Sequence, residues 1–253
     1  MIKQDKMSSL QHRPKATETN KARFDMAKPI KTNNPMDSDN FDILPSNGMV
    51  AGEQVSQWAQ DWWTASLQQS ALNLSNPDWD STGSFESAVN SPGSGMYFLA
   101  GSWGNDPQQG VIRDIGDQSA PAVTAGTPIF IPVLCVVSSQ WRDAGDKANF
   151  NNMSLKDWKT NVDDVFLKID GQSIDVKSDL VRTKSFSAGP AVAGTVGEYL
   201  MDPATGNVET LKATGYYSIV TLSGGREHTI EFGGSTSGSS PTNVHVIDHI
   251  YVA

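Results

Sequence analysis

The sequence predicts an all-β fold: a two-sheet antiparallel β-sandwich of the jelly-roll type, with one Trp-rich helix and an extended N-terminal arm. Past Asn76, Gly, Pro, Ser and Asn recur every 8–12 residues, with short β-branched and aromatic runs between them. This spacing is typical of a sandwich or barrel. The 253 residues are enough for a substantial core. We therefore expect one body, residues 51–253, after an arm of residues 1–50.

Eight segments have the composition of strands. They are Met96–Ala100, Val111–Ile115, Pro128–Val137, Val165–Ile169, Ser173–Val176, Tyr216–Leu222, His228–Phe232 and Val244–Val252. Asp170-Gly171 predicts a tight hairpin between the fourth and fifth of them, because a type I′ turn needs the positive φ that Asp and Gly tolerate. Ser223-Gly224-Gly225 predicts a second hairpin, leading into His228–Phe232.

The longest apolar stretch, Pro128–Val137, is half the length that a membrane span needs and contains Pro132, so we interpret it as a buried strand. We expect no membrane span. Cys135, within this stretch, is the only cysteine of the chain, which excludes an intrachain disulfide. We expect it to be a small core residue rather than a nucleophile.

A helix is predicted over Glu53–Leu72. Val55, Trp58, Trp62 and Ala65 recur there at three- and four-residue steps, which places two indoles on one helix face. Such a face usually packs over a sheet, and an exposed binding face is the alternative.

The arm is basic and the remaining chain is acidic. Residues 1–31 hold eight Lys or Arg against three acids, whereas residues 32–253 hold 11 against 25. The basic residues are Lys3, Lys6, Arg13, Lys15, Lys21, Arg23, Lys28 and Lys31. An acidic body does not suit a nucleic-acid platform, although the arm could contact phosphate or an acidic protein face. A solvated tail is the simpler interpretation.

The start of the chain, MIKQDKMSSLQHRPKATETNK, is polar throughout and lacks the apolar region of a signal peptide. We therefore expect no Sec export, and place the protein in a virion, or in the cytoplasm before assembly.

Several motifs resemble a family of uncharacterised bacterial proteins. They are Ser56-x-Trp58 with Trp62-Trp63, Asn76-Pro77-x-x-Asp80-x-Thr82-Gly83, Gly95-Met96-Tyr97-Phe98-Leu99-Ala100-Gly101, Arg113, Thr124-Ala125-Gly126-Thr127-Pro128-Ile129-Phe130-Ile131-Pro132-Val133 and Gly225-Arg226-Glu227-His228-Thr229-Ile230-x-Phe232-Gly233-Gly234. The resemblance covers residues 55–253 and implies a single, usually exported β-sandwich with no known activity. The basic arm and the missing export signal depart from that pattern and favour delivery as part of a particle.

The candidate metal site is Asp78-x-Asp80-x-Thr82-Gly83, because alternating oxygen ligands before a glycine resemble the start of a calcium loop. Val89 stands where the bidentate carboxylate would be needed. We therefore favour an Asx-turn and expect no cofactor, with weak calcium binding as the alternative.

The final strand alternates between two faces, as expected for a strand paired within a sheet. One face carries Val244, Val246, Asp248, Ile250 and Val252, and the other carries His245, Ile247, His249 and Tyr251. His245 and His249 are roughly 13 Å apart at the rise of a strand, too far to chelate one ion. His228, beside Glu227, is expected on the surface, and His12 lies in the arm.

Three tryptophans in loop-like contexts, Trp79, Trp103 and Trp141, could bind sugar, make assembly contacts or anchor their loops. A Ser/His/Asp site is unsupported, because G-x-S-x-G is absent. Acid pairs such as Asp163/Asp164 occur by chance in any sandwich.

From these patterns we predict a non-enzymatic structural or interaction protein that docks through its arm onto a larger assembly of protein subunits. A virion component, as a capsid decoration or a tail-associated protein, is the specific form expected. The alternatives are a carbohydrate-binding sandwich that uses loop tryptophans, and a hydrolase that uses a carboxylate pair.

Overall fold

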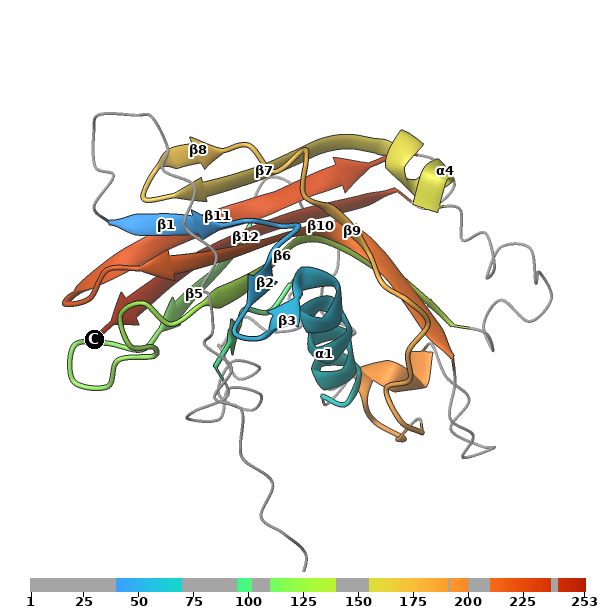
Figure 1. The fold of residues 1–253 in the computed structure, drawn as a ribbon, viewed down its shortest axis with the longest axis horizontal. Helices are drawn as coiled ribbons and strands as arrows, with labels where there is room; N and C mark the ends of the chain where they lie inside the picture. Colours follow the sequence, from blue (N-terminus) through green and yellow to red (C-terminus); the bar gives the residue numbers. More distant parts are fainter. Residues whose placement is uncertain are drawn as a thin grey trace, which may run out of the picture.

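Strands dominate the fold, as the sequence predicts. The computed structural model describes residues 40–69, 95–101, 110–139, 155–190, 192–199, 210–237 and 241–253. These residues form two five-stranded sheets, a two-stranded ribbon, two α-helices and one 3₁₀ turn (Figure 1). The ribbon consists of β2 (Met49–Val50) and β3 (Glu53–Gln54), and the 3₁₀ turn, η1, spans Val196–Tyr199.

The first sheet has the order β1-β10-β6-β4, and β9 also pairs with β10. Its strands are β1 (Phe41–Leu44), β4 (Tyr97–Phe98), β6 (Ile129–Ser139), β9 (Leu180–Arg182) and β10 (Leu211–Leu222). β6 is the predicted apolar strand. Residues on both faces of β6 are buried. Its sequence is therefore a continuous apolar run and does not alternate between apolar and polar residues.

The second sheet has the order β5-β12-β11-β7-β8. Its strands are β5 (Val111–Ile115), β7 (Val162–Ile169), β8 (Gln172–Ile174), β11 (Arg226–Thr236) and β12 (Thr242–Val252). The hairpin from β7 to β8 turns at Asp170 and Gly171, whose φ angles are 50° and 78°. This prediction is confirmed, as is the two-faced alternation of β12.

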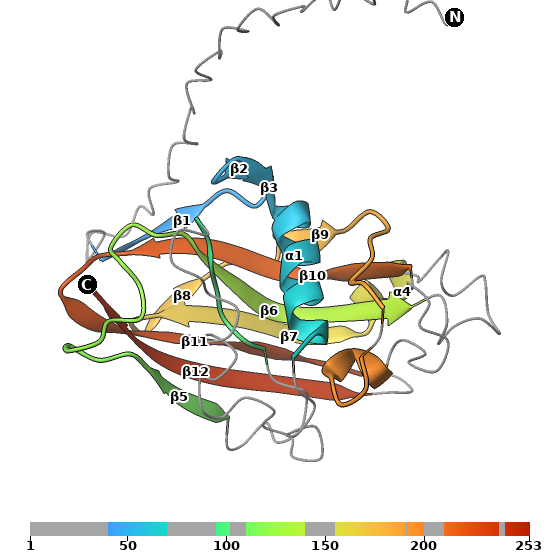
Figure 2. The ribbon, with the colours of Figure 1, turned by 90° about the horizontal axis from the view of Figure 1, so that it is seen from below.

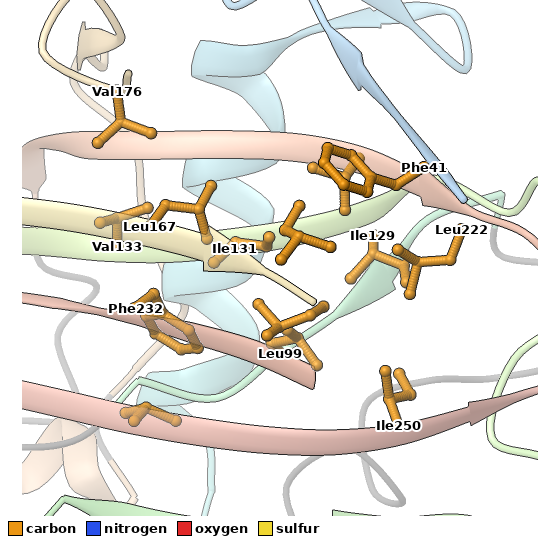
Figure 3. Packing of buried hydrophobic residues seen from close by; sticks show 14 of the residues in the cluster. Phe41, Leu99, Ile129, Ile131, Val133, Leu167, Val176, Leu222, Phe232 and Ile250 are labelled. Atoms are coloured by element: carbon orange, nitrogen blue, oxygen red, sulfur yellow. The ribbon is translucent and has the colours of Figure 1, made fainter. Parts of the chain in front are cut away.

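Two hydrophobic cores divide the molecule into three layers. Side chains of both sheets fill the first core, including Ile129 and Ile131 from one sheet and Leu167, Phe232 and Ile250 from the other (Figure 3). The second core lies between the opposite face of the first sheet and α1 (Val55–Leu67), which crosses β10 and β6 (Figure 2). The short helix α4 (Leu155–Thr160) contacts β7.

The predicted helix is present and shorter than expected. Glu53 belongs to β3, and the helix ends at Leu67, after which the N–H groups of Gln68 and Gln69 bond back to the last turn. Trp58, Trp62 and Trp63 are all buried, so the face predicted to pack over a sheet does so. Within the described chain, neither α-helix is long and apolar enough to cross a membrane.

The sheets are not purely antiparallel. β4 runs parallel to β6, and β5 runs parallel to β12. Both parallel strands are short and lie at sheet edges, where they follow long connections. A parallel pair needs a crossover connection rather than a tight turn, so turn signals could not reveal these pairings.

The predicted arm extends too far along the chain. Phe41–Leu44 form β1 and pair with Ile219–Leu222 of β10, and Phe41 is buried in the first core. Residues 41–44, which are predicted to lie in the arm, therefore belong to the body. The arm's remaining residues, 1–39, lie outside the described part of the chain.

The predicted hairpin at Ser223-Gly224-Gly225 is wrong. β10 and β11, which these residues join, lie in different sheets. Ser223 N–H donates to Asn40 in one sheet, and Gly225 N–H donates to Val252 in the other. A Cβ on Gly224 would lie 2.3 Å from the carbonyl oxygen of Ala253, so glycine permits this crossing. β11 forms its hairpin with β12 instead.

Candidate functional site

Most of the residues predicted to form a site lie outside the described part of the chain. These are the eight basic residues of the arm, the loop tryptophans Trp79, Trp103 and Trp141, and the calcium candidates Asp78, Asp80 and Thr82. Their roles stay predictions. The described candidates are the surface of the second sheet and several polar clusters within the sandwich.

The outer face of the second sheet carries acidic and apolar side chains. α1 packs on the first sheet and α4 contacts β7, so neither described helix covers the centre of this face. The strand alternation and register place on it the carboxylates Asp114, Asp164, Glu227 and Glu231, the basic residues Lys168, His245 and His249, and the apolar residues Ile112, Phe166, Ile247 and Tyr251. Four carboxylates outnumber the one lysine. We name this surface the acidic face.

The rings of Phe166 and His245 meet above Gly233, which pairs with both residues in the register of the sheet. Their centroids lie 5.5 Å apart in an edge-on arrangement. A Cβ on Gly233 would lie 1.9 Å from the carbonyl oxygen of Val244. Glycine therefore permits the close approach of β11 to β12 and leaves the rings space to meet.

Glu231 lies between two basic side chains at the centre of the acidic face. Lys168 Nζ lies 3.1 Å from Glu231 Oε2, and His245 Nε2 lies 3.1 Å from Oε1. Partial burial opposes ionisation of this carboxyl, but the hydrogen bonds from Lys168 and His245 outweigh burial and hold the pKa of Glu231 below its usual value. Glu231 is therefore a carboxylate at neutral pH.

The two histidines of β12 bind different carboxylates. His249 Nδ1 lies 2.9 Å from Asp114 Oδ1, across the parallel pair of β12 and β5, whereas His245 contacts Glu231. Among the described residues, no three His, Cys, Asp or Glu side chains are grouped so that they could hold a metal ion.

Ser223, His228 and Asp170 form an array that resembles a catalytic triad. Ser223 Oγ lies 3.4 Å from His228 Nε2, and His228 Nδ1 lies 2.8 Å from Asp170 Oδ2. Arg226 and the backbone N–H of Thr229 also donate to the Asp170 carboxylate, each at 2.9 Å. The prediction of a surface His228 is wrong, because the residue is only 1% exposed.

The contacts of His228 indicate a structural role rather than the role of a general base. Its Nε2 lies 3.0 Å from the backbone carbonyl of Ser223, closer than the Ser223 hydroxyl. The Ser223 hydroxyl is therefore not the nearest partner of Nε2, and its separation of 3.4 Å exceeds the reach of about 2.6–3.2 Å expected between a general base and its nucleophile. The imidazole also has no solvent-accessible surface through which to reach a leaving group. Through His228, the array connects Ser223 at the sheet crossing with Asp170 in the β7–β8 hairpin.

Two acid pairs bear on the hydrolase alternative. Asp163 and Asp164 are adjacent on β7, where successive side chains point to opposite faces, and Asp163 is bonded to Ser237. Glu53 and Asp61 do meet: burial of Glu53, together with the neighbouring Asp61 carboxyl, raises the pKa of Glu53 above its usual value. Carboxyls close enough to hydrogen-bond are nearer to each other than the separation of about 5 to 9 Å that glycoside hydrolysis uses.

Arg113 and Asp248 form a buried ion pair on the inner side of the second sheet. Arg113 Nε donates to Asp248 Oδ1 at 2.6 Å, and Nη2 donates to Oδ2 at 2.9 Å. Nη2 also donates to the carbonyl of Ala100, two residues after β4. Neither charged side chain is exposed. The pair connects β5, β12 and the chain beyond β4, but its burial keeps it away from any solvent-borne ligand.

Cys135 is partly buried and ends a chain of polar contacts at the second core. Trp63 Nε1 donates to the Tyr217 hydroxyl at 3.1 Å, and that hydroxyl bonds to the thiol of Cys135. Burial raises the pKa of the Cys135 thiol to about 12, although Tyr217 acts in the opposite direction. The thiolate, which is the nucleophilic form, is therefore scarce at neutral pH.

We expect native Cys135 to resist iodoacetamide. At about pH 8, a thiol with a pKa of about 12 is ionised in roughly one molecule in 10⁴. Mass spectrometry of the folded protein should show no alkylation after a time that suffices for full alkylation in urea. Rapid stoichiometric labelling of the folded protein would contradict the raised pKa of the Cys135 thiol and make Cys135 a candidate nucleophile again.

The chain matches no protein-family model, no curated protein and no solved structure. The resemblance of its motifs to uncharacterised bacterial proteins therefore stays a prediction.

Proposed function

We propose that this protein is a non-enzymatic structural or interaction module that joins a larger assembly through its basic N-terminal segment, residues 1–31. A virion component is the specific form that we propose. The charge separation carries the proposal: the segment holds eight Lys or Arg against three acids, and it precedes an acidic chain. A cationic segment attached to an acidic body favours contact with an acidic partner surface.

The arrangement of the body supports this role. The described sandwich has two hydrophobic cores, and its first strand, β1, begins immediately after residue 40. The described cores are thus formed by residues that follow the basic segment in the chain. The described polar clusters are accounted for by contacts that hold strands together, as at Asp170 and Arg113. We further propose a jelly-roll connection pattern, supported by the two facing sheets and the crossing at Ser223–Gly225.

A charge-neutralising variant of the full chain tests the proposal. We expect Lys15, Lys21, Arg23 and Lys28→Gln to release the protein from its assembly. The matched control neutralises four exposed basic residues of the body, Lys159, Lys177, Arg182 and Lys184→Gln, so both variants lose the same charge. The readout is the fraction of the chain that sediments with the particle or complex from its native source, followed by native mass spectrometry.

The two variants separate a specific role of the segment from net charge. Release of the segment variant and retention of the control support the proposal. Equal retention of both variants, or equal release of both, contradicts docking through the segment. Thermal unfolding of each variant verifies that the body remains folded.

A further inference from the structure

We propose that the acceptor of the basic segment is the acidic face of a second copy of this chain, so that copies associate by exchanging N-terminal segments. This inference rests on the proposed function and names the partner. It follows from the charge, the apolar content and the position of the acidic face, and from the point at which the segment joins the body.

The charge of the acidic face complements the segment. Asp114, Asp164 and Glu227 are exposed, and the Asp114 side chain is 83% exposed. Glu231 remains ionised at the centre of the face because Lys168 and His245 bond to it. A cation that approaches this face meets carboxylates on β5, β11 and β7. Contacts of this kind accelerate association and weaken as salt is added.

The apolar residues of the acidic face suit the stems of Lys and Arg side chains. Ile112 is 56% exposed, and Ile247 lies beside it in the parallel register of β12 and β5. Phe166 already has a cation near its ring, since Lys168 Nζ lies 5.8 Å from the centroid. Long basic side chains cover apolar surface with their methylene groups and bind aromatic faces with their charge. The segment supplies such side chains at eight positions.

The length of chain before the point of attachment allows the segment to reach a second copy. Asn40 is fixed at the first sheet, where its carbonyl accepts from Ser223 N–H. The acidic face is the outer face of the other sheet. Residues 1–39 extend up to about 130 Å when straight, whereas a body of this size has a radius of gyration of about 17 Å. An extended segment of this length can therefore reach a neighbouring copy, and the mixture of variants described below separates that acceptor from the chain's own face.

Complementary charge reversal in the full chain tests the exchange. The segment variant is Lys15, Lys21, Arg23 and Lys28→Glu, and the face variant is Asp164→Lys with Glu227→Lys. The matched control, Asp42→Lys with Glu198→Lys, reverses two exposed acids elsewhere on the body. Sedimentation velocity at about 50 mM and about 500 mM salt reports the oligomeric state at two degrees of screening.

We expect the wild type and the control to associate at low salt and to dissociate at high salt. Each reversed variant alone should be monomeric, with a dissociation constant raised at least tenfold, because like charges then face each other. An equimolar mixture of the two should associate again. In that mixture, the Glu segment of one variant meets the Lys face of the other, and the two unaltered surfaces also match.

Three results would overturn the exchange. If the wild type stays monomeric at low salt, a second copy is not the acceptor of the segment. Association of the wild type without rescue in the mixture indicates that the segment binds its own face or another surface. If the control dissociates to the same extent as the two charge-reversed variants, the change in net charge alone explains the effect and the acidic face has no specific role. The proposed function has its own readout, co-sedimentation with the native assembly, and would survive each of these results.

Discussion

Replacing Asp248 by Val should lower the free energy of unfolding by about 3–5 kcal/mol, the range typical of breaking a buried ion pair. Asp248 accepts two hydrogen bonds from Arg113, and neither side chain is exposed to solvent. Without this carboxylate, a buried guanidinium loses its counter-ion in a medium that screens its charge poorly. Urea unfolding of the purified protein measures the change.

A double variant separates the uncompensated charge from the loss of packing. Arg113→Met combined with Asp248→Val removes both charges and leaves a side-chain volume close to the original. We expect it to recover most of the stability, with a remaining cost of about 1 kcal/mol for the Ala100 carbonyl that Arg113 no longer contacts. Equal destabilisation of the single and double variants would contradict the electrostatic explanation. Asp114→Val, at an exposed position of the same strand pair, should change stability by less than about 0.5 kcal/mol.

The Arg113–Asp248 pair also shows where the sequence was informative and where it was not. The alternation of β12 places Asp248 on the same face as Val246 and Ile250, and Arg113 lies between Val111 and Ile115 on β5. Each charged residue thus stands at an inward position of an apolar strand, a signal that a buried partner is required. The sequence does not say that β5 and β12 are neighbours, because a parallel pairing across more than a hundred residues leaves no local pattern.

Local signals therefore predicted elements better than their arrangement. The Asp170-Gly171 turn and the apolar run of β6 were predicted correctly, because both depend on neighbouring residues. The prediction of a hairpin at Ser223–Gly225 is wrong, because a glycine-rich turn can join two strands of one sheet or strands of two different sheets. The burial of His228 is not predicted for the same reason, because it depends on the crossing and on the contact with Asp170.

The acidic face could be predicted only in part. The shared face of His245 and His249 follows from the alternation of one strand, as expected. Their contacts with Glu231 and Asp114 depend on the registers of β12 against β11 and β5, which are set by long-range packing. The meeting of Phe166 and His245 above Gly233 has the same origin. A strand sequence thus specifies which residues share a face, and the neighbouring strands decide what that face can bind.

Replacing Trp62 by Ala should lower the free energy of unfolding by about 3–5 kcal/mol, through cavity formation and lost burial. Trp62 is 2% exposed, donates to the carbonyl of Leu99 at 2.7 Å, and stacks edge-on against Trp63 at 4.8 Å. It therefore joins α1 to the chain that follows β4. Trp58→Ala should fall in the same range, because the Trp58 indole is also buried and donates to Val50.

The control for this prediction lies on the same helix. Gln57 is exposed, and its side-chain amide donates to Asp61 of the same helix at 3.1 Å, so Gln57→Ala should change stability by less than about 0.5 kcal/mol. Trp62→Phe keeps an aromatic ring in the core but loses the hydrogen bond to Leu99, and should fall between the wild type and Trp62→Ala. Urea unfolding of the three variants gives the order. If Trp62→Ala unfolds like the wild type, α1 is not part of the cooperative core, and its tryptophan face becomes a candidate binding surface instead.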